Sequence, residues 1–310
     1  MIDYAQRKMR KLRLQLLDAC NFKCTYCMPE HYRFAKFNDL LSSDELFQIS
    51  SKLVSQGIEE IRLTGGEPLL RPDFKEIVTK LSTLNLQKFG LTTNGFFLSQ
   101  HLEFLKSTKL KFINISLDSL NENKFFYMTK SASFSKVYQA ILQTKKMGFQ
   151  VKINMVVMRG LNDDEILDFV NFSSKYQINV RFLELMKVGP LKDQHDQYFL
   201  PAQEIRNIIS QHHSLIPILT PRDNTAQEYN TDSGAHIGII ASESEAFCTN
   251  CSRIRISATG KLRPCLFVSE TLDVRTMDEV SMNSKIPEFL NLKPISRLPY
   301  VEEPMHIIGG

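Results

Sequence analysis

The sequence predicts an α/β fold, namely a partial TIM-type barrel of six strand–helix units, (β/α)6, followed by a C-terminal extension. Short apolar strands alternate with amphipathic helices six times up to about residue 210, which is typical of a parallel sheet covered by helices. Six units are fewer than the eight of a closed barrel. Chemically distinctive residues directly follow five of the strands, and active sites of parallel α/β folds lie at that edge.

The individual elements are expected in strict order. Strands are predicted at 12–17, 60–64, 88–93, 111–117, 150–158 and 179–184. Ser42 and Glu45 form a capping box that begins the first helix, and Gly57 ends it. Apolar residues at helical spacing predict further helices at 74–84, 98–106, 133–147, 163–176 and 201–209. The polar segment 221–236 is expected to be a linker or loop.

Composition and charge exclude several classes of protein. The 310 residues are 43% hydrophobic and 23% charged, as in an ordinary globular protein with a sizeable core. The net charge of +4 comes from scattered basic residues interleaved with acids, so we expect no nucleic-acid partner, whereas a small anionic ligand would suit it. No apolar run is long enough for a signal peptide or a membrane span, which predicts a cytoplasmic protein without a membrane partner.

All six cysteines fall into two groups of three. The first group, Cys20, Cys24 and Cys27, directly follows the first strand with three and then two residues between the thiols. Three thiolates at such spacing suit an iron–sulfur cubane and leave its fourth iron open. The alternatives are a zinc site, for which no fourth ligand follows nearby, and a disulfide with a spare thiol, which does not suit a reducing compartment.

The second group of cysteines, Cys248, Cys251 and Cys265, again offers three thiolates. A hairpin that turns at 258–260 would bring Cys265 back beside Cys251. This pattern also suggests a cluster with one open iron. A zinc ribbon is the alternative, with a fourth ligand from His212, His213 or His236.

Two arginines lie within the second cysteine group. Arg253 and Arg255 are two residues apart, so both point to the same face of a strand. Two guanidinium groups beside an open metal site would attract an anion, and arginine suits bidentate contacts with phosphate.

The first cysteine loop resembles the S-adenosylmethionine (SAM) cluster loop of the radical SAM superfamily, in which the methionine part of SAM chelates the open iron. Gly65-Gly66-Glu67-Pro68 resembles the superfamily motif that binds the amino group of SAM, although a tight turn beginning a helix is the ordinary alternative. The resemblance implies SAM contacts from Tyr26, Gly66, Glu67, Ser116 and Met186. On sequence alone, Met186 is equally well explained as a core residue.

A longer series of motifs narrows the resemblance. Besides both cysteine groups, the chain contains Thr92-Thr-Asn-Gly95, Ser116-Leu-Asp118, the segments 152–162 and 181–186, and a terminal Gly309-Gly310, in that order. Together they resemble the GTP 3′,8-cyclase family, whose members catalyse the first step of molybdenum cofactor biosynthesis. The segment before Cys20 departs from the family, because Leu-Gln15-Leu-Leu-Asp-Ala19 stands where Ile-Ser-Val-Thr-Asp-Arg is common.

The resemblance implies two domains and a set of GTP-binding residues. Residues 1–218 would form the barrel with one [4Fe–4S] cluster, and residues 219–310 would carry an auxiliary [4Fe–4S] cluster and the Gly-Gly tail. The GTP-binding residues would be Arg13, Arg62, Thr92, Lys152, Arg253, Ile254 and Arg255. Those with a part in catalysis would be Arg253, Arg255, Gly309 and Gly310. Lys152 has independent support, because a lysine within an apolar strand needs an anion, whereas Arg13 and Arg62 could be solvated strand-end charges.

The resemblance also implies a reaction and its partners. The reduced first cluster would cleave SAM to methionine and a 5′-deoxyadenosyl radical, which removes hydrogen from ribose C3′ of GTP. A bond from C3′ to C8 of the guanine would then form, and one-electron reduction and protonation of the resulting radical would give 3′,8-cyclo-7,8-dihydroguanosine 5′-triphosphate. Implied partners are a flavodoxin- or ferredoxin-type electron donor and the next enzyme, cyclic pyranopterin monophosphate synthase, and a homodimer is compatible with the family.

Two other functions remain open from the sequence. One is a different radical SAM enzyme with an auxiliary cluster, such as a peptide maturase, although six cysteines are fewer than most of these contain. The other is a non-catalytic iron–sulfur or zinc scaffold, which leaves Gly65-Gly66, Lys152 and the paired arginines unexplained.

Overall fold

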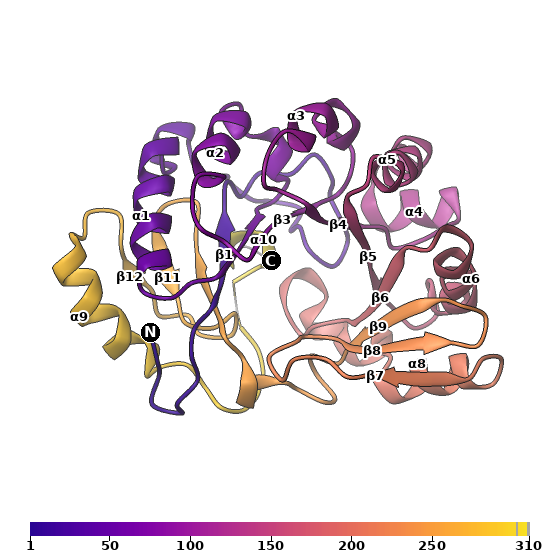
Figure 1. Ribbon diagram of the computed structural model, residues 1–310. Coiled ribbons are helices and arrows are strands. Elements are labelled where there is room, and N and C mark those ends of the chain that lie inside the picture. The colour runs from indigo at the N-terminus through magenta and orange to yellow at the C-terminus, as the bar shows by residue number, and fades with distance from the viewer. Residues whose placement is uncertain (302, 309–310) are drawn as a thin grey trace.

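The computed structural model describes residues 1–301 and 303–308. The described strands form one 12-stranded sheet in the order β12-β11-β10-β1-β2-β3-β4-β5-β6-β9-β8-β7. From β10 through β1–β6 to β9 every neighbouring pair is parallel, and antiparallel strands extend both edges. The sheet is curved, with helices along its outer side (Figure 1). The predicted α/β fold with a partial barrel is therefore confirmed.

All six predicted strands are present. They are β1 (Lys11–Gln15), β2 (Glu60–Thr64), β3 (Lys88–Thr93), β4 (Phe112–Ser116), β5 (Gln150–Val157) and β6 (Asn179–Glu184). Between them lie the helices α1 (Ser43–Ser55), α2 (Phe74–Leu81), α3 (Leu102–Lys106), α4 (Glu122–Thr129), α5 (Phe134–Lys146) and α6 (Ile166–Tyr176). Helix α4 was not expected; it begins where the side chain of Asn121 accepts hydrogen bonds from two backbone N–H groups.

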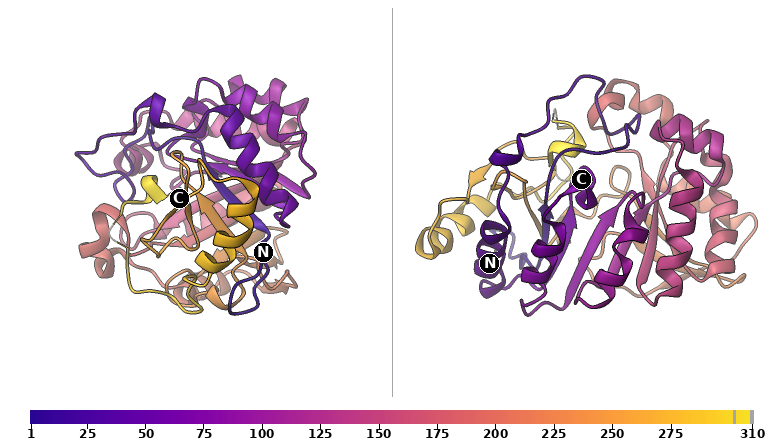
Figure 2. Two further views of the ribbon diagram at one scale, coloured as in Figure 1. Left: turned by 90° about the vertical axis from the view of Figure 1, so that its left-hand side faces the viewer. Right: turned by 90° about the horizontal axis from the view of Figure 1, so that it is seen from above.

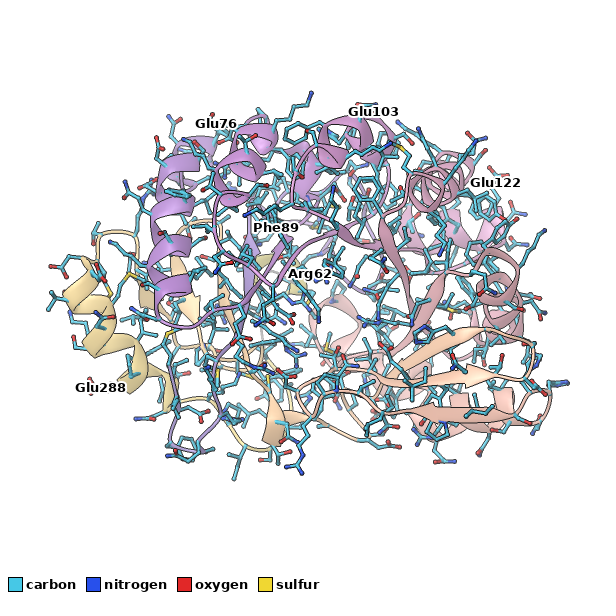
Figure 3. All side chains as sticks on the ribbon, in the orientation of Figure 1. Arg62, Glu76, Phe89, Glu103, Glu122 and Glu288 are labelled. Atoms are coloured by element: carbon cyan, nitrogen blue, oxygen red, sulfur yellow. The ribbon has the colours of Figure 1, made fainter. Side chains whose placement is uncertain are left out.

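The alternation of side chains along the strands decides what faces the barrel interior. In β1, Leu12 and Leu14 are buried in the main apolar core, and Arg13 points to the other side. The same holds in β2 for Ile61 and Arg62. Figure 3 shows Arg62 within the arc of the sheet, whereas Glu76, Glu103, Glu122 and Glu288 lie at the periphery. The core therefore fills the space between sheet and helices, and Arg13 and Arg62 face the barrel interior.

The C-terminal part of the chain supplies strands to both edges of the barrel sheet. Three strands follow β6 on one side, namely β7 (Leu215–Ile218), β8 (Gln227–Thr231) and β9 (His236–Ile240). On the other side lie β10 (Arg253–Ile256), β11 (Lys261–Arg263) and β12 (Leu272–Asp273). The predicted hairpin around 258–260 is confirmed by the antiparallel pairing of β10 with β11.

The prediction of a linker or loop over 221–236 is wrong in part. Strand β8 occupies the middle of this segment and pairs with both β7 and β9. Its buried positions include Glu228 and Thr231. The apolar alternation that normally indicates a strand is therefore absent from the sequence.

The remaining helices are α7 (His195–Tyr198), α8 (Ala202–Ser210), α9 (Glu279–Leu290) and α10 (Met305–Ile308). Helix α9 lies beside α1, where Gln56 Nε2 donates to Asn283 Oδ1 at 2.6 Å (Figure 2). Helix α10 lies on the inner side of the sheet (Figure 1). In the part of the chain described here, no helix combines the length and the apolar character needed to span a bilayer.

Candidate functional site

A cavity of about 230 Å³ lies at the carboxyl ends of the central strands and is referred to as the upper cavity. The three cysteines of the first group line it together with four of the predicted SAM-binding residues, Tyr26, Gly66, Ser116 and Met186. These residues come from the cysteine loop and from the ends of β2, β4 and β6. The sequence placed them at one edge of a parallel sheet, and the structure brings them together there.

The cysteines of the first group are partly buried and line the same cavity. Burial raises the pKa of the Cys20 thiol to about 11 and that of Cys27 to about 12. Burial, the Asp118 carboxylate and the other two thiols together raise the pKa of Cys24 well above its usual range. Such thiols ionise readily only beside a compensating cation, and a bound metal centre supplies one.

The Gly65-Gly66 turn packs directly against the cysteine loop. A Cβ atom at Gly66 would lie 2.1 Å from the Ala19 carbonyl oxygen, so only glycine allows this approach. Gly66 N donates to Leu17 O and Glu67 N donates to Ala19 O, both at 2.8 Å. The turn thereby fixes the backbone just before Cys20, at the position where the sequence departs from the family pattern.

Glu67 has structural contacts that the sequence analysis did not predict. Its side chain is fully buried and does not line the upper cavity. Its carboxylate instead accepts hydrogen bonds from Thr93 Oγ1 at 2.7 Å, Asn94 N at 2.7 Å and Leu69 N at 3.0 Å. Burial raises the pKa of Glu67 to about 7. Glu67 therefore ties the Gly65-Gly66 turn to the end of β3 rather than facing the cavity.

A second cavity, of about 210 Å³, contains the other cysteine group and is called the inner cavity. Cys248, Cys251 and Cys265 line it with Arg13, Arg253 and Arg255. The upper and inner cavities share the lining residues Thr92, Asn154, Leu183, Glu184 and Met186. The two cysteine groups therefore face adjoining spaces inside one barrel.

Positive charge surrounds the second cysteine group. Burial by itself would raise the pKa of the Cys251 thiol, but the charges of Arg253 and Lys293 outweigh it and lower the pKa to about 6. Lys293 is buried, and its Nζ donates to the carbonyl oxygens of Arg253 and Pro264, both at 2.7 Å. This lysine comes from the loop after α9 and was missed by the sequence analysis, because nothing in its local pattern marks it as buried.

A third cavity, of about 310 Å³, lies toward the amino ends of the strands and is called the lower cavity. Four predicted GTP-binding residues line it, namely Arg13, Arg62, Lys152 and Arg253. It shares the residues Arg13, Asn114, Arg181, Thr225 and Arg253 with the inner cavity. The three cavities therefore follow one another along the barrel interior.

Arg13 lies at the centre of a group of guanidinium groups. Burial lowers the pKa of Arg13 well below its usual range, and the charges of Arg62, Arg253, Arg255 and Arg181 lower it further. Within residues 1–301 and 303–308, Arg13 makes no hydrogen bond or ion pair through its side chain. A buried cation surrounded by like charges is unfavourable without an anion, so this arrangement suits a ligand with several negative charges.

The sequence analysis missed three further residues in these cavities. Arg181 lies on β6 and points inward beside Lys152. Its inward direction could have been predicted, because Val180 and Phe182, the residues on either side of it, are the buried apolar positions of β6 and face the opposite side. Asp118 follows β4 and accepts a hydrogen bond from Tyr26 Oη at 2.7 Å. His306, on α10, lines the upper cavity, and its ring packs edge-on against Tyr32 with the centroids 4.1 Å apart.

Besides Glu67, one further predicted residue, Ile254, has a described side chain that lines none of the three cavities. Ile254 is fully buried in the apolar core, on the face of β10 opposite Arg253 and Arg255. The predicted contact of Ile254 with GTP would therefore have to come from its backbone. Gly309 and Gly310 lie outside the described residues. The helix that precedes them, α10, is tied to β1 by a 2.5 Å hydrogen bond from Gln15 Nε2 to His306 O.

Whether a metal centre fits these sites depends on the side chains that could act as its ligands. Among the described residues, no three His, Cys, Asp or Glu side chains are grouped as ligands of a single metal ion. Each cysteine group nevertheless lines one cavity, and its thiol charges influence one another's pKa. Three thiols around an open space fit the donor set of an iron–sulfur cluster with one open iron.

Comparisons with known proteins agree with this arrangement. Residues 14–173 match the radical SAM superfamily, and residues 178–293 match the family described as Molybdenum Cofactor Synthesis C. The chain is 41% identical over 310 residues to a GTP 3′,8-cyclase from Synechocystis sp., covering 100% of this chain and 95% of the relative. It is 38% identical over 279 residues to a GTP 3′,8-cyclase from Aquifex aeolicus, covering 89% and 87%.

Solved structures support the fold alone. Streptococcus suis SuiB bound to S-adenosylmethionine is 15% identical, with a TM-score of 0.65 over 92% of this chain and 68% of that chain. From the sequence relatives and the matching family models, the chain belongs to the GTP 3′,8-cyclase family of the radical SAM superfamily.

Proposed function

We propose that this protein converts GTP to 3′,8-cyclo-7,8-dihydroguanosine 5′-triphosphate, the first step of molybdenum cofactor biosynthesis. One observation carries the proposal beyond family membership. The barrel interior combines a cavity lined by three cysteines with a connected group of arginines centred on Arg13, which has no anionic partner in the described chain. A nucleoside triphosphate supplies the missing negative charge.

Membership of the radical SAM superfamily implies a [4Fe–4S] cluster and SAM. Cys20, Cys24 and Cys27 would hold the cluster, and Tyr26, Gly66, Ser116 and Met186 would surround SAM. When bound and reduced, these groups supply a one-electron cleavage that produces a hydrogen-abstracting radical. Glu67 would support SAM binding indirectly, by fixing the turn that contains Gly66.

The chain's own residues would orient GTP along the barrel interior. Arg13, Arg62, Lys152 and Arg181 of the lower cavity suit the phosphates, because guanidinium groups match phosphate oxygens in geometry and charge. The guanine would then lie toward the second cysteine group, near Arg253 and Arg255. This orientation puts the ribose near Thr92 and Met186, which line both the inner and the upper cavity. Positioning and exclusion of water are the protein's contribution to such a reaction.

A second [4Fe–4S] cluster, held by Cys248, Cys251 and Cys265, is part of the proposal. The positive charges of Arg253 and Lys293 support it, because they favour the thiolate form of Cys251. A cluster with one open iron here would offer a ligand position to the guanine. We further propose that the backbone of Ile254 contacts GTP and that Gly309 and Gly310 take part in catalysis.

The remaining parts of the proposal concern organisation and partners. We keep the division into residues 1–218 and 219–310 as a proposal, together with a cytoplasmic location and no nucleic-acid or membrane partner. A flavodoxin- or ferredoxin-type protein would deliver the electron. Cyclic pyranopterin monophosphate synthase would accept the product, and a homodimer would be compatible with the family.

The experiment that tests the function is anaerobic reconstitution of the full chain with iron and sulfide, followed by dithionite, SAM and GTP. Release of 5′-deoxyadenosine that depends on GTP is expected. Release without GTP dependence would favour another radical SAM enzyme, and no release from iron-loaded protein would favour a scaffold. The Cys24→Ser variant, which removes a ligand of the first cluster, is the control for non-enzymatic cleavage.

A further inference from the structure

Glu228 places a carboxylate among the cations of the lower cavity. Its Oε1 atom lies 2.9 Å from Lys152 Nζ and 3.1 Å from Arg181 Nη2. Its Oε2 atom lies 3.0 Å from His236 Nε2. The side chain of Glu228 is only 10% exposed, so solvent screens these contacts weakly. Two residues that suit phosphate are therefore already bound to an internal anion.

The fold brings Glu228 to this place through an in-register row across three strands. Arg181 on β6 is paired with Gly238 on β9, and Gly238 is paired in turn with Glu228 on β8. A Cβ atom at Gly238 would lie 3.3 Å from Arg181 Cγ and 3.7 Å from Glu228 Cγ. Because Gly238 has no side chain, Arg181 and Glu228 reach across it and form their ion pair.

The other carboxylates of the lower cavity are engaged elsewhere. Glu60 pairs with Lys88 at 3.2 Å, and Asp223 pairs with Arg10 at 2.7 Å and with Lys11 at 3.1 Å. Among the described residues, Glu228 is the acid in ion-pair contact with Lys152 and Arg181. Burial by itself would raise the pKa of Glu228, but its bonds with His236 and Lys152 and the charge of Arg181 hold that pKa well below the usual range. Glu228 is therefore ionised at neutral pH.

We propose that Glu228 is an internal counter-ion, which neutralises Lys152 and Arg181 while the lower cavity is empty and which an incoming phosphate chain displaces from them. The proposal rests on the proposed triphosphate position. On this proposal, Glu228 has opposite effects on the stability of the ligand-free protein and on phosphate binding. Glu228 stabilises the ligand-free protein, because it compensates buried like charges. It also weakens phosphate binding, because the ligand must compete for both cations and tolerate a nearby negative charge.

The test compares the wild-type full chain, after anaerobic reconstitution, with Glu228→Gln, which keeps the shape but removes the charge. Binding of sodium tripolyphosphate is measured by titration calorimetry, and stability is measured by thermal unfolding without ligand. We expect the dissociation constant to fall by about tenfold in Glu228→Gln, which corresponds to about 1.4 kcal/mol. We also expect its unfolding midpoint to fall by a few degrees, on the order of 3 °C.

Two further variants make the result decisive. Glu60→Gln removes a carboxylate from the same cavity, but one that pairs with the half-exposed Lys88, and its affinity for tripolyphosphate should change less than about twofold. Glu228→Ala removes the same charge and serves if Glu228→Gln does not fold.

Tighter binding together with lower stability supports the counter-ion. Unchanged or weaker binding overturns it, since a residue that only orients the two cations would lose affinity and stability together. Tripolyphosphate binding requires no radical chemistry. A protein that lacks cyclase activity but shows the two opposite effects would therefore contradict the proposed function and not the role of Glu228.

Discussion

Tyr26 Oη donates a 2.7 Å hydrogen bond to Asp118 Oδ2 and so links the first cysteine loop to the end of β4. Asp118 is itself held in place, because its Oδ1 accepts a 3.0 Å hydrogen bond from Val156 N at the end of β5. The loop that would hold a cluster is thus anchored to two strands of the barrel. Tyr26 lines the upper cavity, so this anchor also fixes one wall of the proposed SAM site.

Replacing Tyr26 with Phe should weaken SAM binding without loss of iron. The variant removes one hydrogen bond to a carboxylate, worth about 1.5–3 kcal/mol, and leaves the ring and the cysteines in place. We expect the KM for SAM to rise about tenfold or more. The measurement is 5′-deoxyadenosine formation at varied SAM concentration, with iron content measured in parallel. Tyr138→Phe, which breaks the outer Tyr138–Tyr176 hydrogen bond, is the control, and an unchanged KM in Tyr26→Phe would contradict the anchoring role.

Replacing Arg13 with Gln should improve stability while it impairs function. The substitution removes a buried charge that is surrounded by other guanidinium groups, so the unfolding midpoint of the ligand-free protein should rise. The KM for GTP should rise roughly 10- to 100-fold, because charge-assisted contacts with phosphate are lost. Thermal unfolding and steady-state kinetics check both signs. The control variant is Arg206→Gln, which loses an ion pair with Glu245 outside the three cavities. In this control, neither the unfolding midpoint nor the KM for GTP is expected to rise. A less stable Arg13→Gln protein would refute the argument.

Glu67 should make stability depend on pH. Its pKa in the folded chain is raised by burial to about 7, above the ordinary value of 4.5. Between these values the folded chain holds a proton that the unfolded chain has released, so the free energy of unfolding falls as the pH rises through this window. The effect is on the order of 3 kcal/mol. Urea unfolding of the iron-free chain at about pH 5 and about pH 7.5 should show this fall in wild type and a smaller fall in Glu67→Gln.

The Glu67→Gln variant also loses, at every pH, either the acceptor shared by Leu69 N and the Thr93 hydroxyl, which is Oε1, or the acceptor for Asn94 N, which is Oε2. The informative quantity is therefore the change with pH of the difference between the two proteins. A difference that stays constant across the window would show that Glu67 does not titrate there.

Deleting Gly309 and Gly310 should lower turnover and leave the iron content intact. The helix before them lies at the upper cavity, where His306 and Met305 are lining residues. Turnover and iron content of the truncated protein are the measurements. Unchanged turnover would count against a catalytic part for the tail.

The sequence predicted those features that depend on local spacing. The cysteine spacings, the Gly65-Gly66 turn and the apolar alternation of β1 and β2 are local patterns, and each was found where the structure has it. The direction of inward-facing side chains follows from the period of two along a strand. Arg13 and Lys152, which the family resemblance assigned to GTP, both line the lower cavity.

Other features could not be predicted, because they depend on contacts between distant parts of the chain. Glu228 lies on a strand whose buried positions are polar, so its segment resembled a loop. Lys293 is 40 residues from Arg253, whose carbonyl oxygen accepts a hydrogen bond from its Nζ. Glu67 matched a ligand-binding motif, yet its carboxylate accepts hydrogen bonds from Leu69 and from the distant Thr93 and Asn94. In each case the role of the residue is decided by the groups that it contacts, and not by the sequence pattern around it.

The most direct test of the central claim uses GTP deuterated at ribose C3′ with the reconstituted protein, dithionite and SAM. Mass spectrometry of the 5′-deoxyadenosine reports which hydrogen was removed. Transfer of one deuterium into 5′-deoxyadenosine is the predicted result, since the barrel would hold the ribose of GTP beside the SAM site. GTP-dependent release of 5′-deoxyadenosine that carries no deuterium would contradict the account.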